Sequence, residues 1–480
     1  MVWMRGAWQK GIFSSMVNPS AYPIPKHVRF IRRLPGFFLM MVVLLAATPP
    51  GGAANALGAE GSPPDSPIQI PGGPTDFDKS VALALKQSPF FTKSALEIEI
   101  RRLDEKDSKS DMFPSFTGTA RYYPIQPKNN IVGNTTDYSY GISTGDYNPL
   151  FGYLSLKAKR LITQIATLAH MKVISAGIER LGKAFLELHA ADTLAKLRAE
   201  ATELARENLR YVKEQQSLGQ VTPLEVQIAT QETEVAAAEQ DVLISSRRRT
   251  EAAIKEFLGL KPDQPLQLDT SQARRQVLNE FDPKHASLQE AENRDFDVRI
   301  KKLAQELQTW NITLAKMKFV PSVNVAVQSQ TPLSYNGVQG AFFSVGLTFP
   351  IFDGFKRFRN IDRQKKVLGQ FASEETVKAD ELSQKWREAE EKLTSAATAL
   401  RVSQAQAELA RLKVTQAETV YHTGEKDFAI LNAARQNLVK ARMNAVKQAL
   451  DYDLALLELR HLSGNLVYHY VNEDKFKEIK

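Results

Sequence analysis

The chain of 480 residues contains no cysteine. It therefore has no disulfide framework, no thiolate metal site, no cysteine nucleophile and no cysteine that could carry a lipid at its N-terminus. Hydrophobic residues make up 43% of the sequence, which is an ordinary fraction. This composition excludes a chain that is disordered overall, and it excludes a membrane protein built from many spanning helices.

Acidic side chains are absent from residues 1–56, which contain six Lys and Arg residues. Within this segment Arg29, Arg32 and Arg33 precede the apolar run 37–47, and Ala54-Asn55-Ala56 follows. An apolar run of 11 residues suits a signal peptide and is too short to span a bilayer. We predict a signal peptide over residues 1–56; an N-terminal anchor helix is the alternative.

Removal of this leader leaves 56 basic and 54 acidic residues, so the high pI of about 9.2 is largely due to the leader. We therefore expect no nucleic-acid partner, because such binding needs a concentrated positive surface. The run Arg247-Arg248-Arg249 fits the solvated face of a charged helix. Residues 57–75 are rich in Pro, Gly and Ser and are predicted to be a flexible linker.

The remaining sequence contains an internal duplication. Gly219 and Gly424 each lie between two helix-like runs, and each is followed 40 residues later by another glycine. We predict two structural repeats, 76–280 and 281–464, and a C-terminal tail, 465–480. Each repeat is expected to contain a helix, a β-hairpin, a very long helix, a glycine turn and a further helix.

A second shared motif precedes each long helix. Pro149-Leu150-Phe151-Gly152 in the first repeat corresponds to Pro350-Ile351-Phe352-Asp353-Gly354 in the second. We expect strand–helix junctions here, at Pro149 and Gly152 and at Pro350 and Gly354.

The segment 356–421 lacks proline and contains one glycine, Gly369. A continuous helix over it would be roughly 100 Å long. Its apolar and small residues are spaced alternately by four and three, which is the heptad pattern of a coiled coil. They are Leu382, Trp386, Ala389, Leu393, Ala396, Leu400, Ser403, Ala407, Ala410, Val414, Ala417 and Tyr421.

The same pattern continues beyond Gly424, so two antiparallel helices are expected to pack along their length. The first repeat contains a similar series, which consists of Leu194, Leu197, Ala201, Leu204 and Tyr211, with Val226 and Ala229 after the turn. These helices show one narrow apolar seam and a wide polar surface. A coiled-coil rod of the cell envelope would show the same pattern.

Two predicted hairpins argue against a rod. Residues 322–328 place Val323, Val325 and Val327 on one face and small or polar residues on the other, and 343–349 alternate in the same way. In the first repeat the strands are expected within 116–123 and 137–147. This alternation is typical of outer-membrane barrel strands; soluble hairpins that cap the helices are the alternative. Four strands cannot close a barrel, so several chains must contribute.

With these features the chain resembles the TolC family of outer-membrane efflux channels. The resemblance is most specific over 421–428, the run Tyr-His-Thr-Gly-Glu-Lys-Asp-Phe, and its counterpart 218–226. It implies a mixed α/β homotrimer with four transmembrane strands per chain, a 12-stranded barrel and a helical tunnel in the periplasm. It also implies outer-membrane lipid around the barrel, and a periplasmic adaptor and an inner-membrane pump as partners.

The resemblance further implies a gate at the periplasmic tip, with Tyr421, Lys426 and Glu225 as its residues and Gly219 and Gly424 as its tip turns. Ile430 and Ala433 stand where a family member that serves type I secretion has a pair of aspartates, so an acidic ring is not expected at that level.

Both junctions are followed by basic clusters, which are Lys157, Lys159 and Arg160, and Lys356, Arg357 and Arg359. They are expected either to face anionic lipid headgroups, with Phe151, Tyr153 and Phe352 as an aromatic girdle, or to pair with acidic residues of adjacent helices.

No sequence motif indicates catalysis, a metal site or a cofactor. We expect a passive, non-enzymatic export channel. The alternative is a periplasmic adaptor, which should have one helical hairpin between compact β-domains. The sequence does not indicate the exported cargo.

Overall fold

The computed structural model describes residues 73–122, 138–261, 263–279, 281–329, 341–349, 351–423 and 428–471. All of them belong to one compact unit, which spans Gln69–Lys480. Several predicted segments lie wholly or largely outside the described residues: the signal peptide 1–56, residues 57–72 of the linker 57–75, and the last nine residues of the tail 465–480. The predicted site residues Pro350, Gly424 and Lys426 lie outside them as well.

The first half of the unit contains two short helices, a hairpin and two long helices. In chain order these are α2 (Phe77–Gln87), α3 (Pro89–Ser110), β1 (Phe116–Tyr122), β2 (Tyr138–Thr144), α4 (Pro149–Ser217) and α5 (Pro223–Phe257). Helix α4 has 69 residues and is therefore about 100 Å long.

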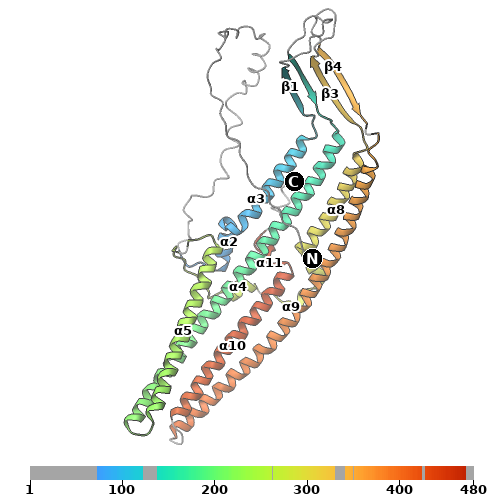
Figure 1. The fold of residues 1–480 in the computed structure, drawn as a ribbon. Coiled ribbons are helices and arrows are strands. Elements are labelled where there is room, and N and C mark those ends of the chain that lie inside the picture. The colour runs from blue at the N-terminus through green and yellow to red at the C-terminus, as the bar shows by residue number, and fades with distance from the viewer. Residues whose placement is uncertain are drawn as a thin grey trace, which may run out of the picture. The chain divides into compact units, whose positions relative to one another are not determined.

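The second half has the same order of a helix, a hairpin and two long helices. Its main elements are α8 (Phe296–Met317), β3 (Ser322–Ser329), β4 (Ala341–Thr348), α9 (Lys356–His422) and α10 (Phe428–Leu462). Four short elements complete the unit: α6 (Ala273–Leu278), η1 (Pro283–His285), α7 (Leu288–Arg294) and α11 (Asn465–Tyr468). Within the unit the strands lie at one end of the long helices, and the α4–α5 turn, the end of α9 and the start of α10 lie at the other (Figure 1).

The four strands form a single antiparallel sheet in the order β1-β2-β3-β4. The two hairpins join between β2 and β3, where Ile142 pairs with Val327 and Thr144 Oγ1 accepts a hydrogen bond of 2.8 Å from Val325 N. Strands β1 and β4 form the two edges and have no further partner strand among the described residues.

The register separates apolar from polar side chains. The pairs Val323–Leu347, Val325–Val345 and Val327–Phe343 place apolar residues of β3 and β4 on one face. The opposite face of β3 and β4 carries Ser322, Asn324, Ala326, Gln328, Ser344, Gly346 and Thr348. The predicted alternation is therefore confirmed, and the apolar face is open: Phe343, Val345 and Leu347 are 59 to 70% exposed.

The predicted heptad seam of α9 is confirmed. Leu382, Trp386, Ala389, Ser403, Ala410 and Val414 are the buried residues of this helix, and each belongs to the predicted series. On α10 the facing residues Leu431, Leu438 and Leu459 are buried as well. Ala410 and Val414 pack on Leu438, which joins the two helices near the middle of the hairpin.

The corresponding seam of the first repeat has a different partner from the one expected. Leu194, Leu197, Ala201 and Leu204 pack against Val439 and Met443 of α10. Contact between α4 and α5 instead combines small residues with ion pairs: Thr233 Oγ1 donates to the carbonyl of Ala205 at 3.3 Å, Ala229 is 3% exposed, and Arg247 pairs with Asp192 at 2.7 Å. The prediction of a single narrow seam per hairpin was wrong for α4 and α10, because α10 packs on both α9 and α4.

The most completely buried residues lie where the short helices pack around the middle of α4. Phe77, Phe185, Leu457 and Leu466 are each 0% exposed. The Phe77 and Phe185 rings meet edge to face, 5.6 Å between centroids. This core fixes the two long hairpins relative to each other and thereby positions their tips.

Candidate functional site

The α4–α5 turn contains the predicted tip residues Gly219 and Glu225. Gly219 has a φ of +74°, which an L-residue adopts only at a cost, so glycine is required there. Glu225 lies in the first turn of α5 and forms a capping box with Thr222. The Glu225 carboxylate accepts from Thr222 N at 3.0 Å, and Thr222 Oγ1 accepts from Glu225 N at 3.4 Å.

Tyr421, the other predicted gate residue in the described part, lies in the last turn of α9 and is 39% exposed. Its ring is 6.2 Å from the Phe428 ring at the start of α10, and Phe428 is 4.7 Å from the Tyr211 ring of α4. The structure thus brings three aromatic rings from three helices together at the tip. Phe428 was not predicted as a gate residue, although its position after the turn motif could have suggested it.

The structure does not place Tyr421 and Glu225 in contact within one chain: the carboxylate of Glu225 is engaged by its own helix cap. Lys426 and Gly424 lie outside the described residues. Ile430 and Ala433, which replace the acidic pair of the resemblance, are exposed on the first turns of α10. The assignment of Tyr421, Lys426 and Glu225 to a gate remains a prediction.

At the first strand–helix junction, Pro149 is the first residue of α4. The Asn148 side chain caps the helix and accepts from Leu150 N at 3.1 Å and Phe151 N at 3.2 Å. Gly152 is buried in the first turn, and a Cβ at this position would lie 2.7 Å from the carbonyl oxygen of Asp111. Gly152 is therefore needed for the close approach of α4 to the end of α3.

The second junction is built differently. Gly354 and Phe355 both have a φ of +63°, and the Asp353 carboxylate caps α9 by accepting from Lys356 N and Arg357 N at 3.1 and 3.0 Å. The Arg357 guanidinium also binds Asp353 at 2.8 Å and holds the pKa of this carboxyl below its usual range.

The two basic clusters after the junctions also differ. In the first repeat all three cations have partners: Lys159 pairs with Asp104 at 3.5 Å, Arg160 pairs with Glu105 at 3.2 Å, and Lys157 lies over the Tyr153 and Trp310 rings. In the second repeat only Arg357 has a partner among the described residues. The two clusters look alike in sequence, and the carboxylates beside the first one distinguish them.

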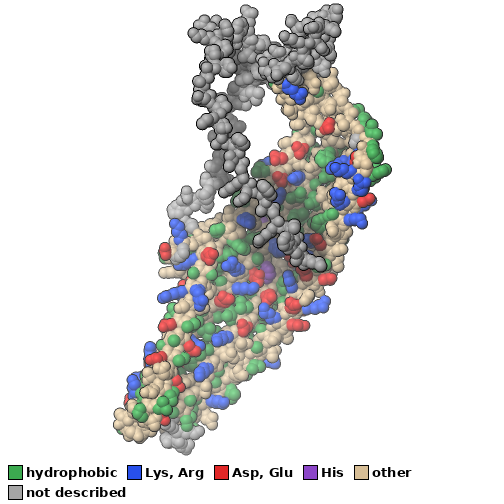
Figure 2. Space-filling model, viewed as in Figure 1, with side chains coloured by type: hydrophobic (Ala, Val, Ile, Leu, Met, Phe, Trp, Pro, Cys, Tyr) green, Lys and Arg blue, Asp and Glu red, His purple; other side chains and the backbone are tan. Residues whose placement is uncertain are grey.

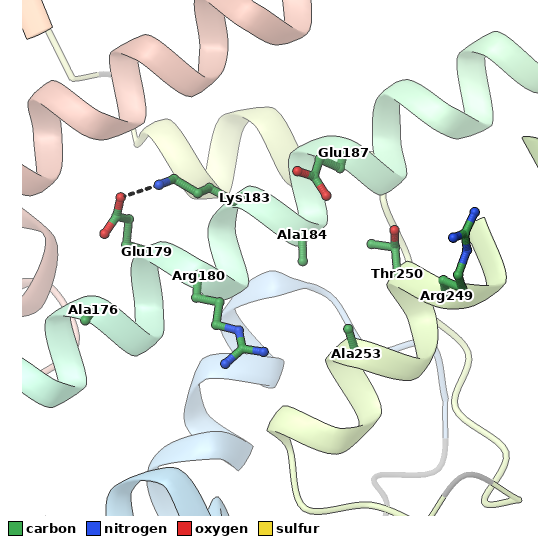
Figure 3. A pocket seen from close by; sticks show the side chains of 9 residues that line it. All are labelled: Ala176, Glu179, Arg180, Lys183, Ala184, Glu187, Arg249, Thr250 and Ala253. Carbon is green, nitrogen blue, oxygen red and sulfur yellow. Dashed lines mark ion pairs between the residues drawn. The ribbon is translucent and has the colours of Figure 1, made fainter. Parts of the chain in front are cut away.

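A groove of about 490 Å³ lies between α4 and α5. Its charged lining is of mixed sign, and Lys183 pairs with Glu179 at 2.7 Å (Figure 3). The described residues contain no group of three or more His, Asp or Glu side chains that could hold a metal ion. Helix α4 is apolar and long enough to cross a membrane, but half of its most apolar window is buried against the rest of the unit.

Comparison with known proteins agrees with this arrangement. Residues 287–465 match the family described as outer membrane efflux protein. No curated protein matches the chain.

Several solved structures have the same fold. A membrane protein from Pseudomonas aeruginosa superposes with a TM-score of 0.67 at 17% identity and covers 81% of this chain and 92% of its own. The CmeC outer membrane channel of Campylobacter jejuni superposes with a TM-score of 0.67 at 17% identity, and the match covers 84% of this chain and 88% of CmeC. The open-state MtrE outer membrane channel of Neisseria gonorrhoeae superposes with a TM-score of 0.62 at 18% identity, and the match covers 81% of this chain and 88% of MtrE. Residues 287–465 are thus similar in sequence to the outer membrane efflux proteins, and the described residues have the fold of the outer-membrane channels.

Proposed function

We propose that this protein is the outer-membrane channel of a tripartite efflux or type I secretion system and extends from the outer membrane into the periplasm. The observation that carries the proposal is the four-stranded sheet with one apolar face, whose strands continue into helices about 100 Å long. The apolar face suits lipid and the small polar residues of the other face suit a water-filled lumen.

The open edges of β1 and β4 support a homotrimer. An unpaired sheet edge is not tolerated in hydrocarbon, so the edges must pair with strands of other copies. Three copies with four strands each give a 12-stranded barrel, and their long helices continue it as a tunnel. We propose that the halves 76–280 and 281–464 are structural repeats of this wall, and that residues 1–56 are removed on export.

The adaptor alternative is not supported. The chain has two pairs of long helices rather than one, and its only sheet among the described residues lies at the end opposite the α4–α5 turn. The matched family consists of efflux proteins rather than enzymes. We propose that the channel conducts passively, that Tyr421, Lys426 and Glu225 gate it at the tip, and that an adaptor and a pump engage the tip and select the cargo.

Fractionation of cell envelopes provides the test. The protein should appear in the outer membrane as a trimer that resists detergent and dissociates on heating. Cysteine introduced at Asn134 or Asn336, in a chain without cysteine of its own, should react with a membrane-impermeant label on intact cells. Labelling at these positions only after the outer membrane is breached would contradict the proposed topology.

A further inference from the structure

One face of the first three turns of α9 carries four exposed cations: Lys356, Arg359, Arg363 and Lys366. We call this set the cation stripe. Steps of three, four and three residues place the four side chains on the same face of the helix. None of them has an ion pair or side-chain hydrogen bond in the part of the chain that the structure describes. Like charges at this spacing repel each other.

The N-terminal end of α9 adds to this electrostatic repulsion. The N-terminus of a helix carries a partial positive charge, which stabilises anions and destabilises cations. The first turn of α9 contains no acidic residue, and the Asp353 carboxylate that caps it is already bound by Arg357. Asp362, the one acidic residue of α9 that neighbours the stripe in sequence, lies 4.0 Å from Lys365 and pairs with none of the four cations. Among the described residues the cation stripe thus has no anionic partner, and an external anion would supply one.

An apolar patch adjoins the cation stripe on the side of the strands. Ile351, Phe352, Phe355 and Phe358 are 56 to 95% exposed, and the Phe352 and Phe355 rings are 5.8 Å apart. Figure 2 shows apolar side chains next to Lys and Arg side chains at this end of the unit. Three of the four apolar residues precede the first cation along the chain, and Phe358 lies between Lys356 and Arg359, so the apolar side chains are on the whole closer to the strands than the cations. A bilayer changes in the same order from acyl chains to phosphate groups.

The dimensions agree with this order. The cation stripe extends over ten helical steps, from Lys356 to Lys366, or about 15 Å. A headgroup layer is about 5 to 8 Å thick, and charges act over a further 8 Å or so at physiological ionic strength. All four cations therefore lie within reach of the surface potential if the apolar patch enters the bilayer.

We propose that the cation stripe binds the phosphate groups of anionic phospholipid in the leaflet facing the periplasm. The proposal rests on the proposed function, because it requires the strands to lie in the membrane. It assigns lipid recognition to the second repeat alone, since the cations of the first repeat are compensated by Asp104, Glu105 and two aromatic rings.

The test uses the full protein reconstituted in phosphatidylcholine vesicles that contain small amounts of spin-labelled lipid. The motionally restricted fraction of labelled phosphatidylglycerol is compared with that of labelled phosphatidylcholine. The stripe variant replaces Lys356, Arg359, Arg363 and Lys366 with Gln. The control variant replaces Arg401, Lys413, Lys440 and Lys447 with Gln. These cations are also exposed and have no ion-pair partner in the described part of the chain, but they lie far from the strands.

The wild type and the control variant should prefer phosphatidylglycerol, and the stripe variant should lose about fivefold or more of this preference, since one Lys or Arg next to an anionic surface contributes about that much. High salt should weaken the wild-type preference. If the stripe variant prefers phosphatidylglycerol as strongly as the wild type does, the proposal is overturned. If the stripe variant keeps this lipid preference and also fails to form oligomers, the cations face a second copy of the chain instead of lipid. Failure of the wild type to insert into any vesicle would overturn the proposed function itself.

Discussion

The ring of Tyr211, near the end of α4, lies 4.7 Å from the ring of Phe428, at the start of α10. These two residues are separated by more than 200 positions and belong to different helical hairpins. Their contact joins the two hairpins of one chain close to the tip, and Tyr421 of α9 adds a third ring at 6.2 Å. Opening of the tip by movement of one hairpin away from the other would have to break this cluster.

Replacement of Phe428 by Ala should therefore favour the open tip. An aromatic pair contributes about 0.5 to 1.5 kcal/mol beyond the area it buries, and three copies multiply the effect in a trimer. Single-channel conductance of the reconstituted protein should rise. Phe428→Tyr keeps the ring and should leave conductance close to that of the wild type, whereas equal conductance in all three proteins would show that the cluster does not hold the tip closed.

The double variant Tyr421→Phe with Lys426→Ser tests the gate implied by the resemblance. It removes a hydroxyl and an ammonium group and keeps the Tyr421 ring contact with Phe428. A typical hydrogen bond contributes about 1 kcal/mol, so conductance should rise as for Phe428→Ala. An unchanged conductance in a variant that assembles normally argues against this assignment.

Glu225 offers a separation of two roles, since its carboxylate already accepts from Thr222 N in the capping box. Glu225→Gln keeps an acceptor for the cap and removes the charge, whereas Thr222→Ala removes the capping hydroxyl and keeps the charge. If Glu225 is part of the gate, conductance should rise in Glu225→Gln and not in Thr222→Ala. Unchanged conductance in Glu225→Gln, with a drop in thermal stability in Thr222→Ala alone, would assign Glu225 to the helix cap only.

Gly152→Ala should destabilise the protein. The new methyl group would lie 2.7 Å from the carbonyl oxygen of Asp111, and backbone atoms cannot rotate away as a side chain can. Overpacking of this kind costs about 1 to 3 kcal/mol. Gly369→Ala is the matched control, because its Cβ meets nothing within 4 Å and alanine favours the helix. Thermal denaturation should show a lower midpoint for Gly152→Ala only.

Acidification should weaken the packing of α10 on α4 through His461. Burial lowers the pKa of this imidazole, whose Nδ1 lies 3.1 Å from Ser175 Oγ on α4. The folded state therefore keeps His461 neutral while the unfolded chain takes up a proton near pH 6.5. The contribution of neutral His461 to the free energy of unfolding is fully present above this pH. It is lost as the pH falls below about 6.5, by at most about 1.4 kcal/mol per pH unit. The thermal midpoint of His461→Gln should fall less between pH 7.5 and 5 than that of the wild type; identical slopes would rule out this contribution.

The elements of the fold could be predicted from local spacing. The heptads of 356–421 and the alternation of 322–328 depend only on the side-chain periods of a helix and a strand, which the covalent backbone fixes. The helix α9 and the strand β3 accordingly appear where they were expected. The order of residues was also enough to identify the turn at Gly219 and the resemblance to the family, because both are carried by short contiguous motifs.

The choice among equivalent partners required the tertiary structure. An apolar helical stripe can pack on any neighbouring stripe, so the sequence could not show that Leu204 packs on Val439 of α10. For the same reason it could not show that Tyr211 meets Phe428. The basic clusters after the two junctions look alike in sequence, and only the positions of neighbouring carboxylates, such as Glu105 beside Arg160, separate the compensated cluster from the uncompensated one. Periodicity is local and was determined by the sequence, whereas pairing depends on which surfaces the folded chain brings together.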